Sequence, residues 1–158
     1  MAKEIERKFL VKNDSYKESA QKNLIKQGYI STDIDKIVRV RISGEKAYLT
    51  IKGKNIGITR SEFEYEIQID DAENMLENIC QKPIVEKIRY KLEYEGHTWE
   101  IDEFFGDNEG LKLAEIELKS EDEAFKKPEW LGIEVSDDVR YYNANLIKSP
   151  YKEWGHTF

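Results

Sequence analysis

The chain has 158 residues, the size of one domain with a substantial core, and we treat 1–158 as a single domain. Its 32 acidic and 25 basic residues give a net charge of −7, which argues against a nucleic-acid coat protein or a polybasic membrane-surface protein. The one cysteine, Cys80, excludes an internal disulfide and a cysteine-based zinc site. No apolar run approaches the ~20 residues of a membrane span and no signal-peptide core is seen, so we expect a cytoplasmic protein.

Charged and apolar residues alternate along most of the chain, which is the pattern of β-strands with two chemically different faces. Glycine-containing turns separate these runs, so we expect a mainly β protein whose neighbouring strands pair in sequence order as antiparallel hairpins. The expected strands are 4–11, 36–42, 46–52, 60–69, 84–94, 98–104 and 111–119, with shorter candidates at 29–32 and 133–135.

Helices are expected between some of the strands. The first is predicted over about 14–27, because apolar residues recur every four positions from Tyr16 to Leu24 and Gly28 can end a helix. The other expected helices are one that follows Asp71 and ends before Pro83, one that opens with a capping box at Ser120–Glu123, and a short turn near 143–147.

One face of the expected strands is apolar and the other is densely charged. The charged face repeats one sign along a strand, as in Glu62 and Glu64 or in Arg39 and Arg41. Two like charges ~7 Å apart cost about 2 kcal/mol at an effective dielectric of about 20. The ordinary alternative is a charged face that simply meets water. The repeated cost, and helices that need an apolar surface to cover, favour a closed barrel with a charged lumen and an apolar outside.

The residue types of this face predict a class of ligand. Carboxylates two residues apart on neighbouring strands offer the oxygen ligands that Mg²⁺ and Mn²⁺ prefer. Arginine and lysine on the other strands suit a polyanion such as a phosphate chain. His97, at a hairpin, and His156, near the C-terminus, have no triad partners and are interpreted as surface residues. The pattern therefore predicts a site for metal-bound polyphosphate.

The segment Glu4-Ile5-Glu6-Arg7-Lys8 matches the ExExK signature of the CYTH superfamily, also called triphosphate tunnel metalloenzymes. The resemblance implies a closed eight-stranded antiparallel β-barrel that forms a tunnel, with helices packed on the outside. It also implies chemistry on a triphosphate that depends on Mg²⁺ or Mn²⁺, for which we expect two ions. Further segments that resemble the family, in order, are 39–41, 49–53, 60–64, 87–90, 99–102, 114–118 and 140–146.

The resemblance also implies roles for individual residues. The implied phosphate ligands are Lys8, Arg39, Arg41, Lys52, Lys87 and Arg89, with Arg60 as a further one. The implied metal ligands are Glu4, Glu6, Glu62, Glu64, Asp102, Glu115 and Glu117. Lys8, Glu6 and Glu117 form the implied catalytic set, and Tyr29 is a candidate substrate contact.

The compact chain resembles the short bacterial members of this family, for which inorganic tripolyphosphate is a favoured substrate. Hydrolysis of tripolyphosphate to pyrophosphate and phosphate is therefore the first expectation. Nucleoside triphosphatase, thiamine triphosphatase and class IV adenylate cyclase are alternatives within the family. A non-catalytic polyphosphate or nucleotide sensor is an alternative of another class. The expected partner is a small-molecule triphosphate, with no nucleic acid and no membrane, and the protein is expected as a monomer or homodimer.

Overall fold

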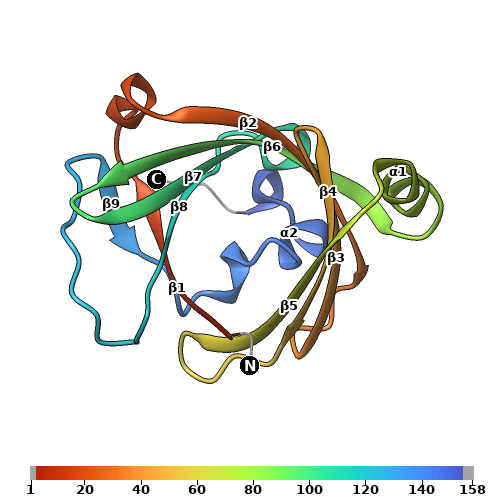
Figure 1. The fold of residues 1–158 in the computed structure, drawn as a ribbon. Helices are drawn as coiled ribbons and strands as arrows, with labels where there is room; N and C mark the ends of the chain where they lie inside the picture. Colours follow the sequence, from red (N-terminus) through yellow and green to blue (C-terminus); the bar gives the residue numbers. More distant parts are fainter. Residues whose placement is uncertain (1–2, 155–158) are drawn as a thin grey trace.

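The computed structural model describes residues 3–154, and nine strands of this part of the chain form one sheet. The strands are β1 (Lys3–Val11), β2 (Gln21–Ser31), β3 (Lys36–Ser43), β4 (Lys46–Gly53), β5 (Thr59–Ile67), β6 (Gln81–Tyr94), β7 (His97–Phe104), β8 (Lys112–Glu117) and β9 (Leu131–Glu134). Their order is β5-β4-β3-β2-β6-β7-β8-β1-β9, and β5 also pairs with β1, which closes β1 to β8 into a barrel (Figure 1). The expected closed antiparallel barrel is confirmed.

The hairpin partners pair in sequence order, as expected for β3 with β4, β4 with β5, β6 with β7 and β7 with β8. Three other pairings of the barrel join distant parts of the chain. β2 pairs with β6, and β1 lies between β8 and β5. The β1–β5 pairing is short and covers Lys3–Ile5 of β1. Further along the same edge of β1, the strand β9 pairs with Phe9 and Val11.

The outward face of the barrel is apolar and is covered in two places. Helix α1 (Ile69–Asn78) lies on the outside beside β3 and β4 (Figure 1), where Ala72 and Leu76 pack on Val40 and Ala47. On the opposite side, Trp99 is fully buried beneath other aromatic rings, with the Trp130 ring centroid 5.5 Å away. This outer packing leaves the charged residues of the same strands facing inward.

The predicted helix over 14–27 is wrong. Only Ser15–Glu18 forms a single 3-10 turn, and Gln21–Ser31 is the strand β2, which includes the short strand expected at 29–32. The i, i+4 apolar spacing is real, but β2 must lie between β3 and β6 for the barrel to close, and this pairing outweighs helix propensity. Leu24, expected on the buried helix face, is 59% exposed.

The predicted helix after Ser120 is also wrong, since the described residues from 120 to 130 contain no helix. The predicted capping box does not form: the Glu123 side chain accepts from the Lys119 amide at 2.5 Å, and the Ser120 hydroxyl donates to Asp122. The chain then stays extended, which places Phe125 and Trp130 against Trp99. Burial of these rings decides the conformation here.

The C-terminal part of the described chain closes one end of the barrel. It contains a 3-10 turn at Val139–Tyr141, the helix α2 (Asn145–Lys148), which matches the turn expected near 143–147, and a 3-10 turn at Tyr151–Glu153. Figure 1 shows α2 within the outline of the barrel, and Leu146 packs in one cluster with Phe104 and Leu113. None of the helices in residues 3–154 has the length and apolar character needed to cross a membrane.

Candidate active site

The lumen contains two adjoining cavities of different chemical character. One, the acidic end, is lined by carboxylates that include Glu4, Glu62, Glu64, Glu100 and Glu117. The other, the basic end, lies against the C-terminal segment and is lined by Lys8, Arg60, Lys87, Tyr142 and Asn143, among others. Six residues line both cavities and join them: Glu6, Arg39, Arg41, Lys52, Arg89 and Glu115. One continuous space therefore runs from carboxylates to cations.

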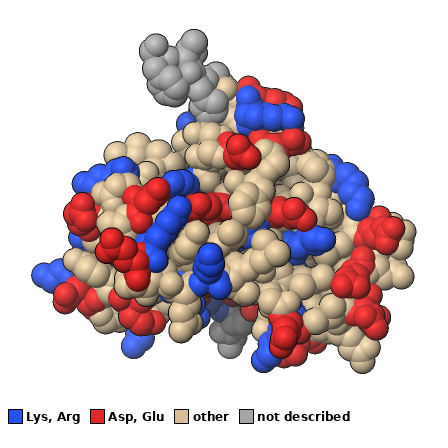
Figure 2. Space-filling view, turned by 90° about the horizontal axis from the view of Figure 1, so that it is seen from above, with Lys and Arg blue, Asp and Glu red and all other residues tan. Residues whose placement is uncertain are grey.

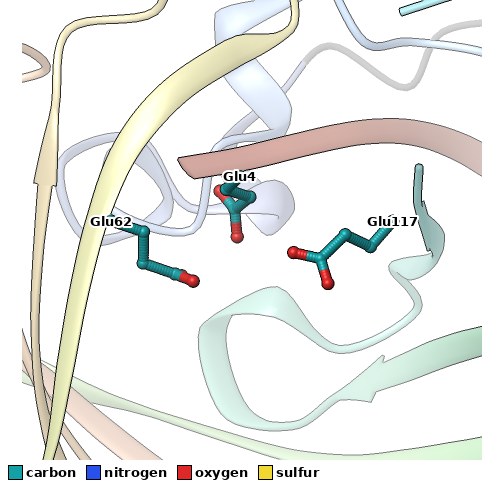
Figure 3. A group of neighbouring side chains, drawn as sticks. All are labelled: Glu4, Glu62 and Glu117. Atoms are coloured by element: carbon teal, nitrogen blue, oxygen red, sulfur yellow. The ribbon is translucent and has the colours of Figure 1, made fainter. Parts of the chain in front are cut away.

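Three carboxylates converge at the acidic end. Glu4 comes from β1, Glu62 from β5 and Glu117 from the end of β8, and one oxygen of each lies within 4.8 Å of the others (Figure 3). Burial, together with the nearby negative charge of Glu4, raises the pKa of both Glu62 and Glu117. The group thus concentrates negative charge at an energetic cost.

Glu4 itself has cationic partners. Lys52 Nζ lies 3.1 Å from both of its carboxylate oxygens, and Arg60 Nε lies 3.2 Å from one of them. Burial would raise the pKa of Glu4, but attraction to Lys52 and Arg60 outweighs burial and lowers it to about 2. Glu4 is therefore ionised at neutral pH and contributes a full charge to the carboxylate group.

Two further carboxylates, Glu6 and Glu115, lie between the acidic and basic ends. The antiparallel register of β1 and β8 sets Glu6 opposite Glu117 and Lys8 opposite Glu115. Burial and the charges of Glu115 and Glu4 raise the pKa of Glu6 well above its ordinary value. Burial acts in the same direction on Glu115, but Lys8 and the hydrogen bond with Glu6 hold its pKa well below the ordinary value. The pKa values of these two neighbouring carboxyl groups are thus shifted in opposite directions.

Asp102 is the one predicted metal ligand that lines neither cavity. Its Oδ2 lies 2.7 Å from Lys87 Nζ, and it accepts two hydrogen bonds from Arg89 at 2.8 and 2.9 Å. Burial raises the pKa of Asp102, but Arg89 and Lys87 outweigh burial and lower it to about 2. Burial lowers the pKa of Lys87 to about 7, against the attraction of Asp102. Asp102 therefore lies behind the basic end and pairs with two of the cations that line it, Lys87 and Arg89.

Arg39 and Arg41 line both cavities from β3. Arg39 donates to Thr50 Oγ1 at 3.2 Å and lies 3.6 Å from a Glu64 oxygen. Arg41 donates from Nε to Gln27 Oε1 at 2.8 Å and forms no ion pair within residues 3–154. Burial and the like charges of Arg39 and Arg89 lower the pKa of Arg41 to about 9. At this point of the lumen the cationic side chains are therefore not fully neutralised by nearby carboxylates.

Lys8 connects the barrel wall to the C-terminal segment. Its Nζ donates to the Tyr141 carbonyl at 3.2 Å and lies 3.8 Å from Glu115 Oε1. The same ammonium lies 5.2 Å from the ring centroid of Tyr142, which the Arg60 guanidinium also faces at 5.9 Å. The Tyr142 ring thus forms an aromatic wall beside two cations.

The structure brings the predicted site residues together in the lumen, with Asp102 behind the wall, and Tyr29, the candidate substrate contact, lines the basic end. His97 lies outside this site and its Nε2 is 2.7 Å from Glu123 Oε2, while His156 lies outside the described residues. On the outer face seen in Figure 2, acidic and basic side chains lie next to one another. On this face the two signs are mixed, whereas the strand residues that line the lumen repeat one sign.

Sequence reasoning missed the neutral side chains of the site. Gln27 is fully buried, and Tyr142 and Asn143 line the basic end. The segment 140–146 resembles the family, but the charge pattern that selected the other residues gives neutral amides no signal. Gln27 was also missed because the apolar residues of its segment have the spacing of a helix, which predicted a helix there.

The acidic end fits a divalent cation. Its ligand atoms are carboxylate oxygens alone, which suits a hard cation. The raised pKa values of Glu62 and Glu117 reflect crowded negative charge that a bound cation would offset. Glu4, Glu62 and Glu117 are the residues of the described chain whose oxygens lie close enough together to share one ion.

A closed antiparallel barrel with a lumen that is acidic at one end and basic at the other defines a tunnel-type barrel suited to a cation and a polyanion. The sequence matches the CYTH domain family over residues 2–151, and the chain belongs to this family.

The chain is similar to named relatives along nearly its whole length. It is 56% identical to an inorganic triphosphatase of Acetivibrio thermocellus, over 98% of this chain and 99% of the relative. It is 39% identical to an inorganic triphosphatase of Nitrosomonas europaea, over 92% and 97% of the two chains. A crystal structure of an inorganic triphosphatase superposes with a TM-score of 0.66 at 36% identity, covering 94% of this chain and 97% of that one.

Proposed function

We propose that this protein hydrolyses inorganic tripolyphosphate to pyrophosphate and phosphate with Mg²⁺ or Mn²⁺ bound. The observation that carries the proposal is the single lumen in which a carboxylate group and a basic end are joined by six shared residues. Such a lumen can hold a cation and a phosphate chain side by side. The activity named for the relatives at 56% and 39% identity supports the same substrate.

Glu4, Glu62 and Glu117 would hold a cation at the acidic end, and Glu6, Glu64 and Glu115, which line the same cavity, are the candidate ligands of a second ion. When bound, such ions supply Lewis-acid polarisation of phosphate oxygens and an activated water. In the metal-free protein, burial and the charges of Glu115 and Glu4 raise the pKa of Glu6. We infer that positive charge in the lumen lowers this pKa and favours the Glu6 carboxylate.

The cations of the basic end would bind the phosphate chain. Arg39 and Arg41 face the centre of the lumen and, as guanidinium groups, can hold phosphate oxygens in pairs. Lys8 lines the basic end and its Nζ lies 3.8 Å from Glu115, one of the residues that join the two ends, so we assign it to the attacked phosphoryl group. Lys52, Arg60, Lys87 and Arg89 complete the basic lining.

We place Asp102 with the basic end and not with the metal ligands. Both of its oxygens accept from Lys87 and Arg89, and its side chain is 1% exposed. A carboxylate in this position favours the charged forms of Lys87 and Arg89 because it offsets part of their loss of hydration, although burial still lowers the pKa of Lys87 to about 7. Its proposed role is to hold these two groups in place beside the phosphate chain and to favour their charged forms.

A phosphate-release panel tests the proposal directly. Tripolyphosphate, pyrophosphate, ATP, GTP and thiamine triphosphate are each assayed with Mg²⁺, Mn²⁺, Ca²⁺ and EDTA, with cyclic-nucleotide detection alongside. We expect the largest kcat/KM for tripolyphosphate and no turnover in EDTA. A larger kcat/KM for a nucleotide would overturn the substrate assignment. Tight binding of every triphosphate without turnover would identify a sensor.

A further inference from the structure

Gln27 lies directly behind the wall of the basic end. It is 0% exposed and touches neither cavity, yet its carboxamide makes three hydrogen bonds to residues that line the basic end. Arg41 Nε donates to Gln27 Oε1 at 2.8 Å, and Gln27 Nε2 donates to Tyr29 Oη at 3.1 Å and to Asn143 Oδ1 at 3.0 Å. A fully buried neutral amide therefore connects three separate parts of the wall.

The direction of these hydrogen bonds is fixed by chemistry. Arginine and lysine side chains only donate. The atom of Gln27 that faces Arg41 must therefore be its oxygen, which turns its nitrogen towards Tyr29 and Asn143. Lys87 Nζ lies 2.8 Å from the same Asn143 oxygen, which fixes the Asn143 amide in the same way. Every donor and acceptor in the chain from Arg41 to Lys87 is thus assigned without reference to hydrogen positions.

This assignment leaves donors aimed away from Gln27. The terminal nitrogens of Arg41, the hydroxyl proton of Tyr29 and the Asn143 Nδ2 have no hydrogen-bond acceptor among residues 3–154. All three residues line the basic end. Because Gln27 is neutral, it orients Arg41 without neutralising the guanidinium, whereas a carboxylate would do both. The neighbouring Arg89 shows the contrast, since Asp102 occupies its nitrogens.

We propose that Gln27 is a positioning residue that aims Arg41, Tyr29 and Asn143 at one phosphoryl group of a bound linear polyphosphate. This rests on the proposed function for its ligand class but not on turnover. Gln27 does not touch the ligand, so it acts through Arg41 above all, and Asn143 ties the same network to Lys87 and the C-terminal segment.

The test measures binding of tripolyphosphate by calorimetry in EDTA, where metal-dependent hydrolysis cannot occur. Gln27→Met keeps the length of the side chain and removes both polar ends, and we expect the dissociation constant to rise about tenfold, the loss of one charge-assisted hydrogen bond. Gln27→Asn keeps a buried amide, but its side chain is too short to bridge Arg41 and Asn143, so we expect a similar rise in the dissociation constant. This variant provides the test if Gln27→Met does not fold. Asn23→Met, an exposed amide four residues earlier in β2, is the matched control and should bind as the wild type does.

A double-variant comparison separates positioning from general damage. Arg41→Lys has no Nε for Gln27 to orient, so adding Gln27→Met to it should change the dissociation constant by less than about twofold. A full additional tenfold loss in the double variant would overturn the proposal, and so would wild-type binding by both single Gln27 variants. If the wild type binds tripolyphosphate but does not hydrolyse it, the proposed function fails while this test remains valid.

Discussion

Lys87 Nζ and Asp102 Oδ2 lie 2.7 Å apart, and each side chain is 1% exposed. Lys87 lines the basic end and Asp102 lies behind it, where Arg89 shares the same carboxylate. A charge buried this deeply is stable only while its partner remains, because neither group can recover its hydration inside the barrel. The Lys87–Asp102 ion pair therefore contributes both to the stability of the fold and to the proposed binding of phosphate by Lys87.

Asp102→Asn should destabilise the protein by about 3 kcal/mol, because breaking a buried ion pair leaves uncompensated charge. Urea denaturation in EDTA at neutral pH measures the loss. Asp14→Asn is the matched control, since Asp14 pairs with Lys112 on the surface, and its cost should stay within about 1 kcal/mol.

The same variant tests the placement of Asp102. We expect the Mg²⁺ concentration that gives half-maximal activity to be unchanged in Asp102→Asn. A rise of about tenfold or more, the size of effect seen when metal coordination is disturbed, would return Asp102 to the metal ligands.

Lys87 predicts a specific pH dependence of stability. Its folded pKa is about 7 because burial outweighs Asp102, while the ordinary value is 10.5. Between these values the unfolded chain holds a proton that the folded protein lacks, so stability from this group rises with pH, by up to about 1.4 kcal/mol per pH unit. Lys87→Met removes the titrating group, and denaturation of both proteins at pH 7, 8 and 9 should show the stability difference growing in favour of the wild type. Parallel curves would contradict the lowered pKa.

Glu117→Gln should reduce metal-dependent phosphate release by about 10–100-fold while leaving the metal-free protein no less stable. The pKa of Glu117 is raised by burial and by the charge of Glu4, so removing its charge relieves repulsion of up to about 1 kcal/mol after allowance for its exposure. Thermal unfolding in EDTA and in Mg²⁺ checks both parts, and Mg²⁺ should raise the Tm of the wild type more than that of the variant.

Glu66→Gln is the control for this change, because Glu66 is an exposed carboxylate of the same strand as Glu62 but outside the converging group. It should keep wild-type activity and Mg²⁺ stabilisation. A clear loss of stability in metal-free Glu117→Gln would show that the carboxylates do not repel one another as the geometry requires.

The parts of the fold that the sequence predicts are those where one strand face is charged and the other apolar. β3 is an example, with Arg39 and Arg41 inward and Val40 outward, and period-2 alternation determines both the strand and its facing. β2 lacks this contrast: Ile25 is buried while Leu24, on the other face, is exposed. Its conformation is set by pairing with β3 and β6, which no local pattern encodes.

The site shows the same division. The charged residues of the site can be recognised in the sequence, because a carboxylate or guanidinium that points inward needs a partner of opposite charge. All the predicted charged residues lie in the lumen or directly behind its wall. Gln27 and Asn143 carry no charge, so their importance appears only when the barrel places their amides against Arg41 and Lys87. Asp102 was predicted as a metal ligand from its motif alone, and its pairing with Lys87 and Arg89, which no local pattern encodes, is visible only in the folded barrel.

The last prediction concerns Tyr142, through which the C-terminal segment forms part of the wall of the basic end. Its ring lies beside the Lys8 ammonium and the Arg60 guanidinium, and its hydroxyl accepts a hydrogen bond from Asn55 at 2.9 Å. Tyr142→Ala removes the ring, and because a desolvated cation–π contact contributes up to about 2 kcal/mol, we expect the KM for tripolyphosphate to rise about three- to tenfold.

Tyr142→Phe is the matched control for that change. It keeps the ring and loses only the hydrogen bond to Asn55, so its KM should stay within about twofold of the wild-type value. Equal KM increases in Tyr142→Phe and Tyr142→Ala would show that the hydroxyl, and not the aromatic face, is what matters. The ring faces cations that are already paired with Glu115 and Glu4, so it holds their positions in the free protein. Because this contact would be the same in the ground state and the transition state, its effect should appear in KM more than in kcat.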